Sequence, residues 1–182
     1  MRILCFGDSN TYGFDPRSFS GSRYPAPWPT LLAENGWEVE NAGMNGRTIP
    51  AAACLPPPRS DTDLLVVMLG SNDLLQGCSA PETAARMEAF LSRLCPVWRH
   101  ILLVAPPPMQ RGEWVTQTRL LSDSAALPAL YRDLAQRLGV AFADAGAWGV
   151  ALRFDGVHFT EDGHRTFARE LAPALRSIAE SI

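Results

Sequence analysis

A serine, an aspartate and a histidine in this chain are of the types that form a nucleophile, an orienting carboxylate and a base. Ser9 follows the apolar run 3–6 in a Gly-Asp-Ser turn, whereas Asp155 and His158 lie close together near the other end of the chain. A serine hydroxyl is a poor nucleophile at neutral pH and needs an adjacent base. An unperturbed imidazole, with a pKa of about 6.5, can serve as that base, and a turn can bring the Asp155 carboxylate to its Nδ1. These residue types predict nucleophilic acyl chemistry, although an Asp-x-x-His spacing alone recurs by chance in many chains.

Acyl transfer also develops a negative oxygen, which needs hydrogen-bond donors. The backbone N–H groups of Ser9 and Gly43 and the side-chain amide of Asn72 are donors of the right kind. One such donor is typically worth about 3 kcal/mol of transition-state stabilisation. Taken singly, Gly43 is better explained as a turn glycine and Asn72 as a turn or cap residue. Their positions in the fold therefore decide between the two interpretations.

Apolar strand-like segments alternate with helical patterns along the chain. The uninterrupted run 64–69 is typical of a strand buried on both faces of a sheet. The alternation predicts an α/β fold with a mainly parallel sheet, formed as one domain over residues 1–182. The expected strands cover 3–6, 37–41, 64–69, 101–105 and 140–142, the expected helices lie near 29–35, 80–95, 127–138 and 167–178, and the segments 14–28 and 109–122 are expected to be irregular.

The candidate residues follow the ends of these strands. Ser9 comes after the first strand, Gly43 after the second, Asn72 after the third, and the 155–158 turn after the fifth. Ligand sites in parallel sheets form outside the carboxyl ends of the strands. We therefore expect these groups to meet along one edge of the sheet, although more than 140 residues separate the first from the last in sequence.

Composition narrows the possible partners. The chain has 182 residues, 47% of them hydrophobic and 19% charged, which is typical of a globular protein. A net charge of −3 without a cluster of cations argues against nucleic acid or a membrane surface as a partner. Every cation is an arginine, so Schiff-base chemistry and a phosphate-binding lysine are excluded.

The four cysteines indicate a reduced setting. Cys5, Cys54, Cys78 and Cys95 show neither a CxxC spacing nor a metal-ligand pattern, so we expect free thiols and a cytoplasmic protein. The apolar run after Met1 is too short for the core of a signal peptide, and no stretch approaches the roughly 18 apolar residues of a membrane span.

Four ordered segments resemble the sequence blocks of the SGNH (GDSL) hydrolases. They are 7–9 (Gly-Asp-Ser), 41–46 with Gly43, 70–73 with Asn72, and 155–158 (Asp-Gly-Val-His). The runs 3–9, 104–108 and 156–161 are most similar to the bacterial arylesterase/acyltransferase branch. The resemblance implies a flavodoxin-like three-layer α/β/α sandwich with a five-stranded sheet, and no metal or organic cofactor.

Carried over position by position, the resemblance makes Ser9 the nucleophile, His158 the base and Asp155 its orienting partner. It assigns the oxyanion contacts to Ser9, Gly43 and Asn72. Two positions beside the acyl site depart from the usual pattern, with Asn10 where many members have Leu and Ser71 where Thr is usual. Acyl preference therefore cannot be inherited from the resemblance.

Substrate contacts are expected at Asn10, Ser71 and Trp148. Trp28 and Trp114 also lie in irregular segments, and each of the three tryptophans either walls a cleft or covers apolar core. His100 and His164 have no partner that the sequence can name, and we expect both to be solvated.

The predicted activity is hydrolysis of small, short-chain esters through an acyl-enzyme. In the arylesterase branch an alcohol can compete with water, so acyl transfer is an implied second activity. Two alternatives stay open: an esterase for acetylated sugars or xylan, and a non-catalytic binder of a small ligand at the same sheet edge. The Pro- and Trp-containing segments 14–28 and 109–122 also suggest self-association into a homo-oligomer.

Overall fold

The fold is built on one five-stranded parallel sheet. A computed structural model describes residues 1–17, 22–50 and 61–182; Cys54 and part of the 14–28 segment lie outside them. The strand order is β2-β1-β3-β4-β5, and every paired strand is parallel to its neighbour. This is the flavodoxin-like order, so the predicted fold class is confirmed. The strands are β1 (Arg2–Gly7), β2 (Glu38–Gly43), β3 (Leu64–Met68), β4 (Ile101–Ala105) and β5 (Ala141–Asp144).

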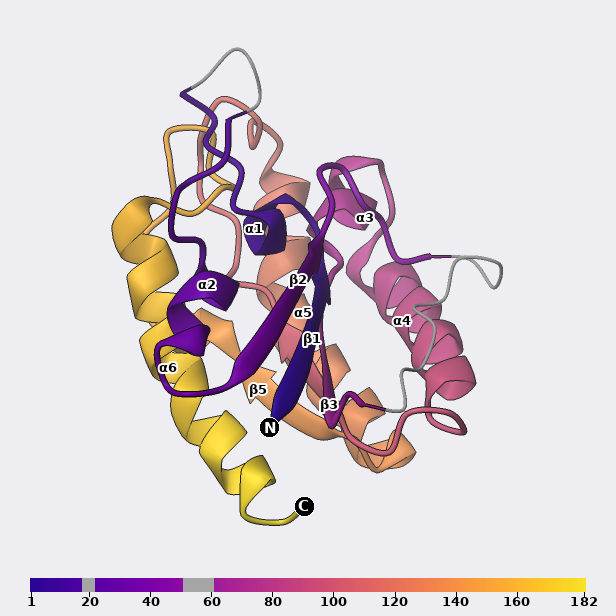
Figure 1. Ribbon diagram of the computed structural model, residues 1–182. Coiled ribbons are helices and arrows are strands. Elements are labelled where there is room, and N and C mark those ends of the chain that lie inside the picture. The colour runs from indigo at the N-terminus through magenta and orange to yellow at the C-terminus, as the bar shows by residue number, and fades with distance from the viewer. Residues whose placement is uncertain (18–21, 51–60) are drawn as a thin grey trace.

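Side chains alternate across the sheet and form two separate cores. Leu65 and Val67 of β3 face helices α4 (Ala80–Leu94) and α5 (Thr118–Leu138), whereas Leu64 and Val66 face α2 (Trp28–Ala33) and α6 (Glu161–Ala179). Figure 1 shows α2 and α6 on one side of the strands and α4 on the other. Because successive strand residues point to opposite faces, one apolar run supplies both cores and fixes the three-layer arrangement.

Two helices extend further than their sequences suggest. Helix α5 begins at Thr118 and continues through Pro128, so the irregular segment predicted for 109–122 ends at Gln117. A proline inside a helix removes one backbone hydrogen bond. The buried face of α5, which includes Leu120, Leu127 and Leu134, packs on the sheet and outweighs that loss. Helix α6 likewise continues through Pro173.

Three short elements follow strand ends. These are α1 (Ser9–Tyr12) after β1, α3 (Ser71–Leu75) after β3, and the 3-10 turn η2 (Ala145–Ala147) after β5. Elements of three to five residues are too short to show a hydrophobic period, so the sequence did not predict them. Two of them carry candidate site residues at their first turn.

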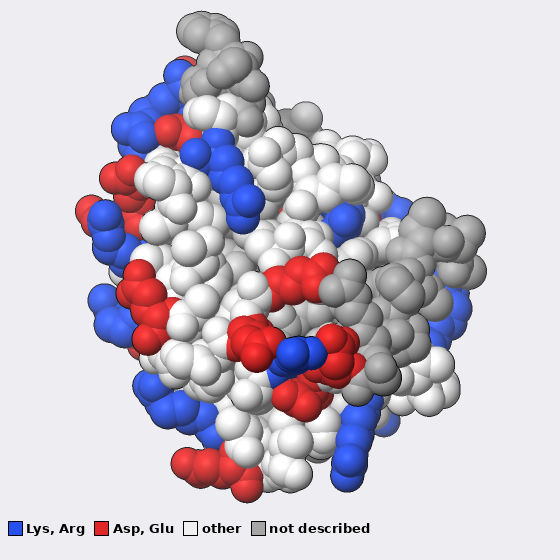
Figure 2. All heavy atoms as spheres, in the orientation of Figure 1, with Lys and Arg blue, Asp and Glu red and all other residues white. Residues whose placement is uncertain are grey.

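Charged side chains of both signs lie on the visible surface (Figure 2). On the face shown in Figure 2, acidic and basic side chains alternate along the left margin, and several acidic side chains surround one basic side chain near the centre. Among the described residues, no helix combines the length and apolarity that crossing a bilayer requires.

Candidate active site

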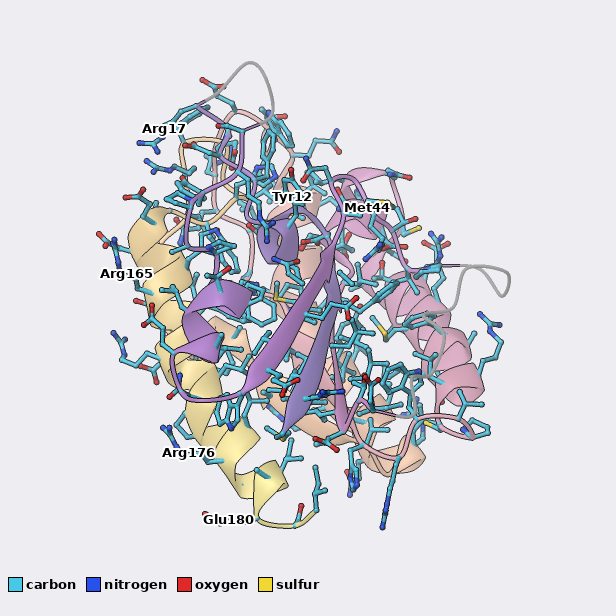
Figure 3. The ribbon with its side chains drawn as sticks, in the orientation of Figure 1. Tyr12, Arg17, Met44, Arg165, Arg176 and Glu180 are labelled. Carbon is cyan, nitrogen blue, oxygen red and sulfur yellow. The ribbon has the colours of Figure 1, made fainter. Side chains whose placement is uncertain are left out.

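The turn that carries Ser9 is held by its own aspartate. Asp8 caps α1, and its Oδ1 accepts a hydrogen bond of 2.9 Å from the Asn10 N–H. Ser9 is therefore the first residue of a capped helical turn at the carboxyl end of β1, and only 6% of its surface is exposed. Tyr12, which ends this turn, and Met44, which follows β2, both lie at this edge of the sheet in Figure 3.

The three residues expected to act together are in contact. The Ser9 hydroxyl lies 2.9 Å from His158 Nε2, and His158 Nδ1 lies 2.8 Å from Asp155 Oδ2. An ionised carboxylate only accepts hydrogen bonds, so the imidazole proton is on Nδ1 and Nε2 is free to accept from the serine. The structure thus brings together hydroxyl, imidazole and carboxylate from the two ends of the chain.

Asp155 is both buried and well supplied with donors. Its Oδ1 accepts hydrogen bonds from the N–H groups of Val157 (2.8 Å) and His158 (2.9 Å). Burial alone would raise the pKa of Asp155, but the hydrogen bonds from His158 and the two backbone N–H groups hold this pKa below its ordinary value. Asp155 is therefore ionised at neutral pH and able to stabilise an imidazolium.

A cavity of about 140 Å³ opens beside this contact. Asn72, the second residue of α3, lines it, and its Nδ2 donates to the Arg47 carbonyl at 3.0 Å. An amide group carries two hydrogens, so this bond orients Asn72 and leaves one N–H for a ligand. The cavity is lined by Ser9, Phe14, Asn45, Gly46, Asn72, Leu75, Trp114, Val157 and His158.

Gly43 does not line this cavity. Its N–H donates to Asn41 Oδ1 at 2.9 Å, so the donor that the sequence assigned to the oxyanion is already used. A Cβ at position 43 would collide with the backbone of Thr11 and Tyr12, which explains the glycine as a close contact between β2 and α1. Gly46, in the turn after β2, lines the cavity instead and has a positive φ of 73° that favours glycine.

A family model matches the segments that form this site. The model of the GDSL-like Lipase/Acylhydrolase family matches residues 5–166. The chain belongs to this family. The matched region includes Ser9, the cavity-lining residues Gly46 and Asn72, and the loop 155–158.

Solved structures resemble this GDSL-like hydrolase over almost its whole length. A carbohydrate acetylesterase family member from Sinorhizobium meliloti is 30% identical, with 97% of each chain covered and a TM-score of 0.82. The native aryl esterase of M. Smegmatis is 28% identical, covers 97% of this chain and 98% of its own, and has a TM-score of 0.81.

A curated relative is longer. The acetylxylan esterase of Xylanibacter ruminicola is 24% identical over 97% of this chain, which spans only 43% of that esterase. The shared region of the two proteins is therefore less than half of the longer one.

None of the three expected substrate contacts lines the cavity. Asn10 is 4% exposed and is bonded to the backbone on either side of His158, and Ser71 is buried at the start of α3; neither lines the cavity. Trp148 packs edge-on against Phe167, at 5.1 Å between ring centroids, on the α6 side of the sheet. Its role in this hydrolase is core packing, as is that of the fully buried Trp28.

Two aromatic rings that were not assigned to the site cover its histidine. Phe14 and Trp114 lie 4.9 and 5.0 Å from the His158 ring between centroids, and both line the cavity. Trp114 is 50% exposed, so it forms an outer wall of the site. The sequence signal for Trp114 as a wall of the site was its position in a segment predicted to be irregular. Trp28 and Trp148 share that signal, so it did not distinguish Trp114 from them.

Arg47 braces the strand ends behind the cavity. Its guanidinium donates to the carbonyl oxygens of Gly7 (2.9 Å) and Ala42 and lies 4.1 Å from the centroid of the Phe6 ring. Burial lowers the pKa of this arginine despite the attraction of Asp8. The hydrogen bonds from Arg47 to Gly7 and Ala42 link the ends of β1 and β2.

Metal coordination was not expected at this site. Across residues 1–17, 22–50 and 61–182, no three His, Cys, Asp or Glu side chains group as ligands of one ion.

Proposed function

We propose that this protein is a serine esterase that acts through an acyl-enzyme. The observation that carries the proposal is the continuous contact from Ser9 through His158 to Asp155 at the edge of a cavity. Ser9 Oγ attacks the ester carbonyl carbon while its proton passes to His158 Nε2. Collapse of the tetrahedral intermediate breaks the ester C–O bond, and the imidazolium returns the proton to the leaving alcohol.

Water then completes the cycle. His158 takes a proton from a water molecule that attacks the acyl-enzyme carbonyl, and it returns that proton to Ser9 as the carboxylic acid leaves. If an alcohol takes the place of water, the same steps transfer the acyl group, which is the proposed second activity. Asp155 stays ionised throughout and stabilises the imidazolium formed in both halves of the reaction.

The oxyanion contacts are proposed at Ser9, Asn72 and Gly46. The backbone N–H of Ser9 and the second amide hydrogen of Asn72 retain their expected roles, supported by the position of both residues at the cavity. The backbone N–H of Gly46 replaces that of Gly43, since Gly43 donates to Asn41. An oxyanion hole of this kind contributes most when its donors are fixed before the reaction, as the Asn72–Arg47 bond fixes the amide.

A small acyl group fits the cavity best. Its volume of about 140 Å³ is well below the 300–1,000 Å³ that is typical of pockets for drug-sized ligands. Phe14, Leu75 and Val157 give it an apolar lining suited to a methyl or short alkyl group. We therefore propose acetyl and similarly short esters as substrates, in agreement with the names of the esterases that the chain resembles.

An acyl-chain and leaving-group panel tests this proposal. The expected order of kcat/KM is p-nitrophenyl acetate, then butyrate, then octanoate, with Ser9→Ala as the inactive control. Comparable rates on acetylated xylose or xylan would favour the carbohydrate esterase alternative. A fluorophosphonate probe should label the wild-type protein at Ser9. If the folded protein is neither labelled nor active on any ester, a non-catalytic binder is the better interpretation.

Three further expectations belong to the proposal. A single catalytic domain over residues 1–182 is supported by the family match to 5–166. A cytoplasmic location is supported by the free thiols of Cys5, Cys78 and Cys95. Self-association remains a prediction, and light scattering tests it; a mass equal to one chain would contradict it.

A further inference from the structure

The residue after the nucleophile holds the loop that carries the base. Asn10 Nδ2 donates to the Val157 carbonyl at 3.0 Å, and Asn10 Oδ1 accepts from the Phe159 N–H at 2.9 Å. These two backbone groups lie on either side of His158. The side chain is 4% exposed, and both ends of its amide are used. We propose that Asn10 is a positioning residue, which fixes His158 relative to Ser9.

The other backbone groups of this loop are held from within the loop or from the segment 110–114, whose Gln110, Glu113 and Trp114 N–H groups donate to the carbonyls of Gly156, Phe154 and Asp155. Asp155 Oδ1 accepts the N–H groups of Val157 and His158, and the His158 carbonyl accepts from the Arg153 N–H at 2.7 Å. Of these holding residues, Asn10 alone belongs to α1, the helix that begins with Ser9. The two bonds of Asn10 therefore set the position of the loop relative to the nucleophile.

This link matters because the Ser9–His158 contact joins residues 149 positions apart. A nucleophile and its base must keep hydrogen-bond distance and direction, and a misplacement of about 1 Å costs on the order of 10²-fold in rate. An amide supplies one donor and one acceptor in a fixed plane, which matches the outward carbonyl of Val157 and the N–H of Phe159. A leucine at this position has the size of asparagine and can make neither bond.

Asn10 also lies outside the group of residues that line the cavity. A residue that contacts the acyl group changes the rates of short and longer esters unequally. A residue that only positions the base lowers all of them by the same factor. The acyl-chain profile therefore distinguishes positioning by Asn10 from the substrate contact that the sequence suggested.

The inference rests on the proposed function, so the wild-type protein is measured first. Asn10→Leu and Asn10→Asp are then compared on p-nitrophenyl acetate and butyrate. The Leu variant removes both hydrogen bonds at similar volume, and the Asp variant keeps the acceptor for Phe159 and loses the donor to Val157. The expected result is a fall in kcat of about 10- to 100-fold for both esters and variants, with KM within about threefold.

Thr83→Val is the matched control. It also replaces a buried polar side chain by an apolar one of the same shape, and it removes the 2.8 Å bond from Thr83 Oγ1 to the Ser79 carbonyl on α4. We expect it to lower the melting temperature as Asn10→Leu does and to leave kcat unchanged. Near-ultraviolet circular dichroism checks folding, and if the Leu variant does not fold, the isosteric Asp variant decides.

Two outcomes would overturn the inference while leaving the esterase intact. One is a kcat within about threefold of wild type in folded Asn10 variants; the other is an acetate-to-butyrate ratio changed by more than about threefold. A wild-type protein that is inert to esters and to the fluorophosphonate probe would instead refute the proposed function itself.

Discussion

Two histidines six residues apart have opposite surroundings. His158 and His164 are both almost fully buried, at 2% and 0% exposure. Both ring nitrogens of His158 have partners, Ser9 and Asp155. In the first turns of α6, His164 Nδ1 accepts a 3.3 Å hydrogen bond from the Trp28 N–H, and its Nε2 has no partner among the described residues. Burial alone therefore does not make a histidine a base.

The difference lies in what stabilises a positive ring. A carboxylate touches His158, so a proton arriving from Ser9 is accommodated. His164 is packed between the rings of Tyr24 and Phe159, each 5.3 Å away between centroids, and burial lowers its pKa to about 3. His164 is thus a neutral core residue, which corrects the expectation that it is solvated.

Substituting each histidine should separate chemistry from packing. His158→Asn is expected to lower kcat on the order of 10⁶-fold, as loss of the base does in serine hydrolases whose triad acts as a unit. His164→Phe, measured at about pH 8, should stay within tenfold of wild type, because His164 does not contact Ser9 or Asp155. The assay is p-nitrophenyl acetate hydrolysis on proteins whose circular dichroism shows them folded. More than about 1% residual activity in the first variant would contradict the assignment of the base.

The carboxylate partner gives the next largest effect. Asp155→Asn keeps the shape of the side chain but places an amide against Nδ1, which favours the wrong tautomer of His158 and is expected to cost about 10⁴-fold in kcat. Asp162→Asn is the control, because that aspartate is exposed and pairs with Arg165. Equal activities of the two variants would show that the His158–Asp155 contact does not serve the reaction.

The comparison also shows what could be predicted from sequence. Four strands were predictable as short apolar runs and the fifth, 37–41, from its alternation of apolar and polar residues; the rule for parallel sheets then brought Ser9, Asn72 and His158 to one edge. Helix α5 was predicted too short because Pro128 is a local signal, whereas the burial that carries the helix past it is not local.

The errors at the site have the same origin. Gly43 ends β2 and Gly46 lies in the turn that follows, and nothing in their spacing tells which N–H is already bonded to a neighbouring side chain. Trp114 and Trp148 both lie in irregular segments, and only the fold decides that one covers His158 and the other Phe167. Sequence patterns predict which residues follow the strand ends. The direction in which a loop side chain points depends on contacts with distant segments, which those patterns do not contain.

Acid should expose the burial of His164. Its folded-state pKa of about 3 lies below the unfolded value of about 6.5, so between these values only the unfolded state binds the proton. The neutral His164 therefore contributes fully to the free energy of unfolding above pH 6.5. As the pH falls below that value, this free energy decreases by about 1.4 kcal/mol per pH unit. Urea unfolding of wild type and His164→Phe from about pH 7.5 to 4.5 measures it.

The two stability curves are expected to cross. Near neutral pH the Phe variant should be about 1 kcal/mol less stable, since the Trp28 N–H loses its acceptor. Towards pH 4.5 the variant should become the more stable protein, because it has no imidazole to protonate. Parallel curves would mean that His164 titrates normally in the folded state.

Asp8 gives the smallest effect and completes the comparison. Burial raises the pKa of Asp8 to about 6, against the opposing effects of the hydrogen bond from the Asn10 N–H and of the nearby His158 and Arg47 side chains. Its folded-state pKa lies above the unfolded value of about 3.9, so stability is lost as the pH rises between the two values, by at most about 3 kcal/mol.

Asp8→Asn keeps an oxygen for the Asn10 N–H and removes the charge. We expect this variant to exceed wild type in stability by about 2 kcal/mol near pH 7.5 and to match it near pH 4. Its kcat should fall by only a few-fold, because Asp8 acts on the imidazolium of His158 at a distance, whereas Asp155 touches it. If the variant neither becomes more stable at neutral pH nor loses activity, Asp8 is uncharged in the wild-type protein. The negative charge beside His158 would then come from Asp155.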